Sequence, residues 1–318
     1  MTDTGRAPHS GSYDDTPLEI ARDDGDGRFP FAPGETLAAA MKRVLVGEIG
    51  SARQALADPK ISREEAIHRV RRRLKRARSL FFVLEEVPGA NRENRAIQAR
   101  DTARLLAGAR DADVLAGEAR RILARAEGGS VAAAGLLVER LENRRDAAHR
   151  VLPPLDEVAA RLRASEADAR SLPDRFEAGR LLAEAIVACH RRGREDWRRL
   201  NDGICAETLH DWRKRVKRRR HLSALVPIAT PVTSRAVQHD LERLGEILGE
   251  EHDLAVLEAR LADENDLLRP REGRDGVREL VARRRRKLTR KALELGEELF
   301  GLRSRDVAEA LAGLRELC

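Results

Sequence analysis

HRVRRRLKRAR (residues 68–78) recurs as HDWRKRVKRRR (residues 210–220) in the second half of the chain. Positions i, i+3, i+7 and i+10 match in the two copies, and they hold His68, Arg71, Lys75 and Arg78 in the first and His210, Arg213, Lys217 and Arg220 in the second. On a helix with about 3.6 residues per turn, this spacing places all four side chains on one face. Together with the residue at i+4, which is Arg72 or Lys214, they fall within an arc of roughly 120°.

An apolar stripe runs beside this cationic face in both copies. It consists of Ile67, Val70, Leu74, Ala77 and Phe81 in the first copy, and of Leu209, Trp212 and Val216 in the second. Each segment is therefore predicted to be a helix that packs one side into a core and carries a cationic ridge next to it. A single basic run is usually a solvated helix face, but repetition in the same histidine phase favours a common function.

The composition predicts an all-α protein. Hydrophobic residues make up 42 % of the 318 residues, aromatic residues 3 % and charged residues 36 %, with Ala, Leu, Arg and Glu dominant. The net charge of +7 favours a polyanionic partner without naming one. Of the 61 basic residues 54 are arginine, which suits bidentate phosphate contacts but would also follow from a GC-rich genome.

No stretch approaches the 18 or so apolar residues of a membrane span, and the N-terminus lacks the apolar run of a simple export signal. The three cysteines, Cys189, Cys205 and Cys318, have no metal-ligand spacing and indicate a reducing compartment. We therefore expect a cytoplasmic protein without a membrane partner.

The chain is predicted to contain a tail and two helical units. Residues 1–33 are rich in proline, glycine and acidic side chains, which is typical of a disordered tail. The first bundle is expected over 34–165 and the second over 174–318. Helices are predicted from Leu37 to the break at Asp58-Pro59, and then from a capping box at Ser62 and Glu65 to Pro88-Gly89. Further helices are predicted over about 91–115 (with a break near Gly108), 131–152 and 175–200, followed by the helix that contains His210 and ends at Pro227. The last ones are predicted over 234–261 and 276–299, with a short one from Asp306.

The repeat extends beyond the two ridges. LLAGARDADVL (105–115) aligns with ILGEEHDLAVL (247–257) at the offset that separates His68 from His210, which matches Asp111 to Asp253. LVER (137–140) aligns with LVAR (280–283) after one inserted residue, which matches Arg140 to Arg283. Each half thus holds about four helices in the same order, and we expect an internal duplication that forms two four-helix bundles related by a pseudo-two-fold axis.

The repeated aspartates and histidines allow more than one role. Asp111 and Asp253 are expected to brace the guanidinium groups of the ridges, with Arg140 and Arg283 as further supporting residues. General acid–base catalysis by these aspartates would need a nucleophile, a metal or a second carboxylate, none of which repeats in both halves. A metal site at the histidines is a poor fit because their helical neighbours are Arg and Lys, and we expect no metal and no cofactor.

Known nucleotide and nucleic-acid signals are weak. The chain has no P-loop and no dinucleotide-binding glycine motif. It has one Tyr, two Trp and six Phe, so few rings are left to stack on bases. A surface that grips phosphates but cannot stack bases suits a ligand made of phosphate alone.

The duplicated H-x-x-R-x-x-x-K-x-x-R motif, followed in each half by an aspartate in a D-x-x-V-L context, resembles the CHAD family of conserved-histidine α-helical domains, over about residues 34–318. The resemblance implies two four-helix bundles with a basic groove or pore between them that binds inorganic polyphosphate without catalysis, and so a place at polyphosphate granules. The implied ligand contacts are His68, Arg71, Arg72, Lys75, Arg78, His210, Arg213, Lys214, Lys217 and Arg220.

Two departures from a strict repeat concern local structure. Arg219 takes the core position that Ala77 holds in the first half, so the second helix is expected to sit differently or to let Arg219 reach toward water. Ala107 stands where the second half has Gly249, so the turn before Asp111 is expected to differ. CHAD members are often fused to a triphosphate-processing CYTH domain, and this chain is expected to act as a stand-alone binder. The alternatives are a metal-dependent phosphohydrolase of polyphosphate or phosphate esters, and a nucleic-acid-binding helical protein.

Overall fold

A computed structural model describes residues 32–84, 94–152, 154–227, 230–263, 267 and 273–317, and within these ranges every regular element is a helix. The predicted all-α fold is therefore confirmed. The predicted disordered tail and the predicted helix end at Pro88-Gly89 lie outside the described residues, apart from residues 32 and 33.

The helices are, in chain order, α1 (Leu37–Ala57), α2 (Arg63–Leu84), α3 (Asn94–Leu105), α4 (Ala107–Leu123), α5 (Ser130–Arg150), α6 (Leu155–Arg170), α7 (Ala178–Asp202), α8 (Ala206–Ser223), α9 (Arg235–Asp263), α10 (Arg274–Phe300), α11 (Ser304–Ala310) and the short 3-10 helix η2 (Ala312–Glu316).

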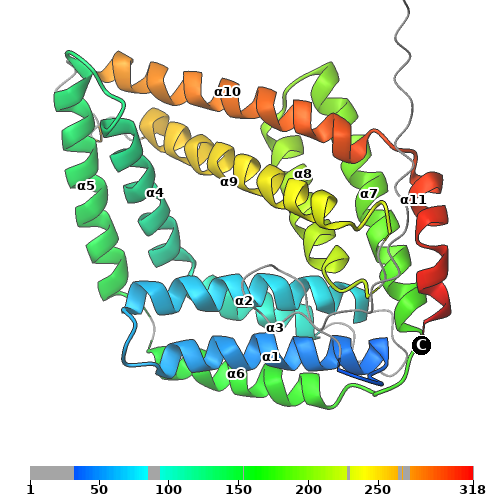
Figure 1. Ribbon diagram of the computed structural model, residues 1–318. Coiled ribbons are helices and arrows are strands. Elements are labelled where there is room, and N and C mark those ends of the chain that lie inside the picture. The colour runs from blue at the N-terminus through cyan, green and yellow to red at the C-terminus, as the bar shows by residue number, and fades with distance from the viewer. Residues whose placement is uncertain are drawn as a thin grey trace, which may run out of the picture.

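The first bundle consists of α1, α2, α3 and α6, which pack against one another along the lower edge of Figure 1. Its core contains the apolar stripe predicted for the first ridge, since Ile67, Val70, Leu74, Ala77 and Phe81 are all buried. Burial of this stripe fixes the rotation of α2 about its axis and leaves the cationic ridge outside the core.

The second bundle consists of α7, α8, α9 and α10, with α11 and η2 packed on α7. Leu209, Trp212 and Val216 of α8 are buried in its core, as the second apolar stripe predicts. The ring of Trp212 meets the edge of the Phe300 ring at a centroid distance of 5.9 Å. The second ridge is thereby held outside its own bundle core.

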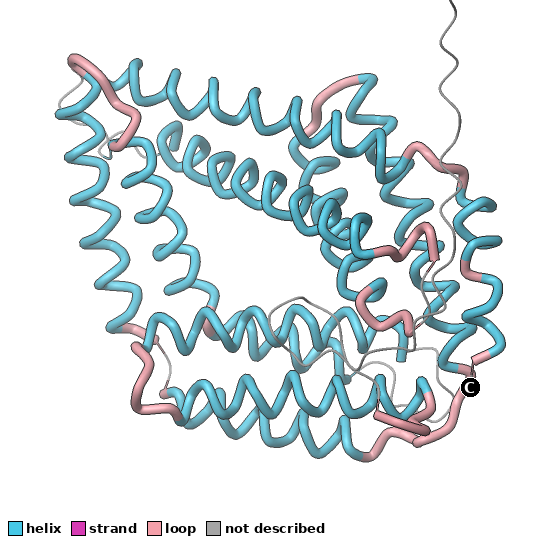
Figure 2. The backbone as a smooth tube through the Cα atoms, viewed as in Figure 1, coloured by secondary structure: helices cyan, strands magenta, loops and turns pink. Residues whose placement is uncertain are grey.

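Helices α4 and α5 leave the first bundle and form an antiparallel pair that packs on α9 and α10. Leucines from both sides form a separate apolar cluster there, including Leu115, Leu137, Leu254 and Leu257. Figures 1 and 2 show the result, in which the two bundles and the α4–α5 pair surround a central region bordered by α2, α4, α8 and α9. The division of the chain into units 34–165 and 174–318 stays a prediction.

The helix order agrees with the proposed duplication. At the offset that separates His68 from His210, α1 and α2 correspond to α7 and α8, the α3–α4 pair to the single helix α9, and α5 to α10. The α3–α4 break lies at Leu106, next to the Ala107 that replaces Gly249, whereas α9 runs on through Gly249. The duplication itself stays a prediction, since no comparison tests it.

Three local outcomes bear on the sequence reading. Ser62 Oγ accepts a hydrogen bond from the Glu65 backbone N–H at 3.1 Å, which is one half of the predicted capping box. Arg219 is buried rather than extended to water, and it donates to the Leu299 carbonyl oxygen at 2.7 Å. Helix α6 has no counterpart among the predicted helices, because two of the side chains on its buried face, Ser165 and Glu166, are polar and break the apolar pattern.

Candidate functional site

A cavity of about 560 Å³ lies where α2, α4, α8 and α9 face one another. Its wall is made of His68, Arg71, Arg72, Lys75 and Arg76 from α2, Arg110 and Arg121 from α4, Arg213, Lys217, Arg220 and His221 from α8, and Glu242, Gly245, Glu246, Gly249, Glu250 and Asp253 from α9. Nine of these side chains are arginine or lysine and four are carboxylates, so the cavity is strongly cationic.

Both ridges reach this one cavity. Seven of the ten predicted ligand contacts line it, namely His68, Arg71, Arg72, Lys75, Arg213, Lys217 and Arg220. Arg78, His210 and Lys214 do not. Two segments from opposite halves of the sequence therefore supply cations to the same space.

The pKa values of the two ridge lysines are lowered by the cavity that surrounds them. Desolvation by the surrounding protein, followed by repulsion from Arg213 and Arg71, lowers the pKa of Lys75 to about 8. Desolvation, followed by repulsion from Arg213 and from Lys75, lowers the pKa of Lys217 to about 7. The Lys75 charge thus acts on Lys217 across the α2–α8 interface, and a bound anion would stabilise the charged form of both lysines.

The arginines of the ridges are held by a few specific contacts. Arg71 donates to the Ala103 carbonyl oxygen at 2.8 Å and lies 3.8 Å from a carboxylate oxygen of Asp111. Arg220 donates to Glu242 at 2.7 Å. Burial lowers the pKa of Arg213, and the Nε atoms of Arg71 and Arg213 are buried without a hydrogen-bond partner. Both guanidinium groups line the cavity, so an anion there can meet their remaining N–H donors.

The two motif histidines occupy different environments. His68 lines the cavity, where burial and the Arg110 charge lower its pKa. His210 instead stacks on His252 with ring centroids 4.7 Å apart, and burial followed by the Lys214 charge lowers its pKa. His252 has its pKa lowered to about 4, chiefly by burial and next by Arg213. Sequence reasoning treated His68 and His210 as equivalent ligands, and the structure separates them.

The four residues predicted as supporting lie in different places. Asp253 lines the cavity, where burial raises its pKa although Arg213 and Lys217 act in the opposite direction. Asp111 is 67 % exposed and touches the ridge only through Arg71 in the described part of the chain. Arg140 on α5 and Arg283 on α10 do not line the cavity.

Two of the predicted ligand contacts face elsewhere. The Lys214 ammonium donates to Asp211 at 2.9 Å on the exposed side of α8. Arg78 is exposed, and partial desolvation by the surrounding protein, followed by repulsion from Arg218, Arg100 and Arg104, lowers its pKa. Arg78 therefore belongs to a different cationic neighbourhood from that of Lys75.

Several wall residues were missed by sequence reasoning, namely Arg76, Arg110, Arg121, His221, Glu242, Glu246 and Glu250. Arg110 directly precedes Asp111 and aligns with His252 at the repeat offset. Its place inside the second repeated segment could therefore have identified it as a candidate site residue. His221 shares a 2.9 Å hydrogen bond with Ser79, its own counterpart at the repeat offset. Arg121 has no such signal, because its position depends on the α4–α5 pair folding over the cavity.

The described residues contain no group of three or more His, Cys, Asp or Glu side chains arranged to hold a metal ion. Of the helices in the described ranges, none is long and apolar enough to cross a membrane. The donor set of the cavity, dominated by guanidinium and ammonium groups, is suited to an anion with many oxygens.

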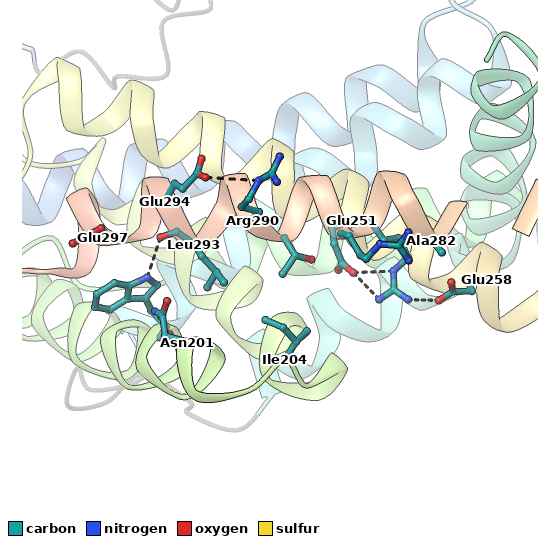
Figure 3. A pocket seen from close by; sticks show the side chains of 13 residues that line it. Asn201, Ile204, Glu251, Glu258, Ala282, Arg290, Leu293, Glu294 and Glu297 are labelled. Carbon is teal, nitrogen blue, oxygen red and sulfur yellow. Dashed lines mark hydrogen bonds and ion pairs between the residues drawn. The ribbon is translucent and has the colours of Figure 1, made fainter. Parts of the chain in front are cut away.

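A second cavity, of about 680 Å³, lies between α7, α9 and α10 and is shown in Figure 3. Its charges are largely paired with one another. Arg285 donates to both Glu251 and Glu258, and Arg290 lies 3.8 Å from Glu294. The Trp197 ring N–H donates to the Leu293 carbonyl oxygen at 3.1 Å on its apolar wall. Because opposite charges alternate along it, this cavity offers no cationic surface to a polyanion.

The chain is similar to known proteins in sequence pattern and in fold. The model of the CHAD domain matches residues 50–262. A search of curated proteins gives no match. Among solved structures, PptA from Streptomyces chartreusis is 15 % identical with a TM-score of 0.61, and the match covers 83 % of this chain and 100 % of that one. The CHAD domain from the plant Ricinus communis is 21 % identical with a TM-score of 0.55, covering 96 % and 98 %. Since the family model spans about two thirds of the sequence and a CHAD structure shares the fold, this chain belongs to the CHAD family.

Proposed function

We propose that the protein binds inorganic polyphosphate without chemical turnover in the cavity between α2, α4, α8 and α9. The observation that carries the proposal is the convergence of both motif copies on one cationic cavity, where desolvation, followed by repulsion between cations, lowers the pKa of both Lys75 and Lys217. Membership of the CHAD family supports polyphosphate as the polyanion.

Binding would follow from charge and donor geometry. A polyphosphate chain carries about one negative charge per internal phosphate, and guanidinium forks bind phosphate oxygens in a bidentate manner. The guanidinium groups of Arg71 and Arg213 and the ammonium groups of Lys75 and Lys217 line the cavity and would supply such contacts from both sides. Each charge-assisted contact is expected to contribute about 1.5 to 3 kcal/mol.

The two alternative functions fit the cavity less well. A nucleic-acid binder would need rings on which bases stack, and the rings that line the cavity in the described part of the chain are the imidazoles of His68 and His221. A metal-dependent phosphohydrolase would need several ligating side chains grouped together, and the described residues hold no such group of three or more His, Cys, Asp or Glu side chains. Of the four carboxylates in the cavity wall, Glu242 and Glu250 already accept hydrogen bonds from Arg220 and Arg284.

The proposal is tested by calorimetric titration with long-chain polyphosphate, tripolyphosphate and single-stranded RNA at one fixed salt concentration. We expect the tightest binding for the long chain, and steep weakening at higher ionic strength because counterions are released. Phosphate release is measured in parallel with Mg²⁺ or Mn²⁺ present. Metal-dependent release of phosphate, or a preference for RNA over polyphosphate, would contradict the proposal.

A cytoplasmic location at polyphosphate granules is part of the same proposal. It is tested by following a fluorescent fusion of the full chain in cells that do and do not accumulate polyphosphate. We expect foci in the first case and a diffuse signal in the second, and foci that persist without polyphosphate would contradict it.

A further inference from the structure

The two ends of the ridges differ in charge at matched positions of the repeat. In the second half, Arg220 donates to Glu242 at 2.7 Å, and Glu246 lies one turn further along α9. At the repeat offset, the first half has Arg78 in place of Arg220, and Arg100 and Arg104 in place of the two glutamates. One end of the site therefore has two glutamates beside its arginine, and its counterpart has arginine at all three matched positions.

Arg78, Arg100, Arg104 and Arg218, here called the Arg78 cluster, come from α2, α3 and α8. The guanidinium of Arg218 lies over the Phe82 ring at 4.1 Å from its centroid, which places α8 beside the end of α2 that carries Arg78. Arg100 and Arg104 share the carboxylate of Asp101, at 3.2 and 3.3 Å. The charges of Arg218, Arg100 and Arg104 all act on Arg78, whose pKa burial also lowers.

The cluster is exposed and contains more charge than its partners neutralise. Arg78 and Arg104 are exposed, and Arg100 and Arg218 are half-exposed. Within the described ranges, neither Arg78 nor Arg218 forms an ion pair. Gathering like charges costs free energy in the absence of a counter-charge, which an anionic ligand would supply.

The Arg78 cluster lies next to the cavity, along α2 and the neighbouring helix α3. Arg78 follows Lys75 by three residues on α2, about 4.5 Å further along the helix axis. Arg71, which lines the cavity, donates to the carbonyl oxygen of Ala103, the residue before Arg104. A chain of phosphates that leaves the cavity past Lys75 would therefore meet the Arg78 cluster next.

We propose that the Arg78 cluster is a second binding site for phosphates of the same polyphosphate chain, occupied only when the chain is long enough to extend out of the cavity. This inference rests on the proposed function. It adds three arginines that the repeated motif does not contain, namely Arg100, Arg104 and Arg218. It also predicts at which end a long chain leaves the cavity, because the glutamates beside Arg220 would repel phosphates at the other end.

The test compares R100Q/R104Q with K287Q/K291Q, in which two exposed cations four residues apart on α10 are neutralised away from both cavities. Each is titrated with long-chain polyphosphate and with tripolyphosphate. For R100Q/R104Q we expect at least about a tenfold loss of long-chain affinity with less than about a twofold change for tripolyphosphate. The control is expected to change neither by more than about twofold.

A single R78Q variant gives an independent reading in case the double variant folds poorly, which circular dichroism would show. Equal losses of affinity for both ligands would mean that the cluster only raises the positive electrostatic potential of the cavity. Unchanged long-chain affinity would mean that the cluster binds no phosphate. Either result overturns the inference while leaving the proposed function intact. Failure of the wild type to bind either ligand overturns the proposed function instead.

Discussion

Helices α2 and α8 carry the same motif, yet their side chains meet different neighbours. On α2, His68 and Arg72 line the cavity and Arg78 is free of carboxylate partners among the described residues. On α8, the matching His210 stacks on His252, Lys214 pairs with Asp211, and Arg220 pairs with Glu242. The cations at i+3 and i+7, which are Arg71 and Lys75 on α2 and Arg213 and Lys217 on α8, line the cavity in both helices. A repeated motif therefore determines which helical face the side chains share but not the partners of each side chain.

The cores beneath the two ridges differ in the same way. Ala77 is buried in the first bundle, and its counterpart Arg219 is buried in the second. Arg219 donates there to the Leu299 carbonyl oxygen, its guanidinium carbon lies 5.1 Å from the centre of the Phe300 ring, and its Nε has no hydrogen-bond partner. Burial lowers the pKa of Arg219 to about 10, which still leaves it charged near neutral pH.

The largest effect is expected when the shared feature of the two helices is removed. The K75A/K217A double variant should lose at least about 3 kcal/mol of polyphosphate binding, or roughly a hundredfold in affinity, because two charge-assisted contacts disappear. Calorimetry measures the loss and circular dichroism checks that helicity is unchanged. Wild-type affinity in this variant would show that the ligand binds elsewhere.

The next effect is on stability and is confined to the second half. Arg219→Ala is expected to lower the free energy of unfolding by about 3 kcal/mol, because it leaves a void beside Phe300 and an unpaired carbonyl at Leu299. Urea denaturation measures it, and Lys214→Ala, at an exposed position of α8 outside the cavity, serves for comparison. A loss below about 0.5 kcal/mol would mean that the Arg219 contacts contribute little.

A smaller effect separates the i+4 positions. Arg72→Ala should weaken polyphosphate binding by about 1.5 kcal/mol, since Arg72 lines the cavity. Lys214→Ala should change it by less than about 0.5 kcal/mol, because the Lys214 side chain is 57 % exposed and already paired with Asp211. Parallel titrations compare the two variants. Equal losses of affinity would mean that Arg72 and Lys214 both contact the ligand, as the repeated motif predicts.

The smallest effect concerns pH. In the free protein the pKa of Lys217 is about 7 and that of Lys75 about 8, and a bound polyanion raises both. Binding therefore takes up protons, and affinity should fall as pH rises from about 7 to 9. Arginine stays charged across this range, so K217R should flatten the profile by a factor of about two to three. His68→Gln should leave the slope unchanged there, and a slope that depends on His68 would assign the effect to that histidine instead.

Much of the fold followed from the sequence, because the apolar stripes that rotate α2 and α8 are local patterns. The buried Trp212 and the helix start after Ser62 are examples. Helix α6 was missed because Ser165 and Glu166 occupy its buried face. In the site, the residues that depend on neighbours from distant segments escaped prediction. Arg121 joins the cavity only through the packing of α4 on α9, and Arg220 is neutralised by a glutamate 22 residues away.

We propose that α2 and α8 build one shared site rather than two independent ones. The most direct test is calorimetric titration of a short, homogeneous polyphosphate into wild type, Lys75→Ala and Lys217→Ala, with stoichiometry as the deciding quantity. One ligand per protein is predicted in all three, with affinity lowered by each single substitution. Two ligands per wild-type protein, with one of them lost in each variant and the other bound as before, would contradict the account.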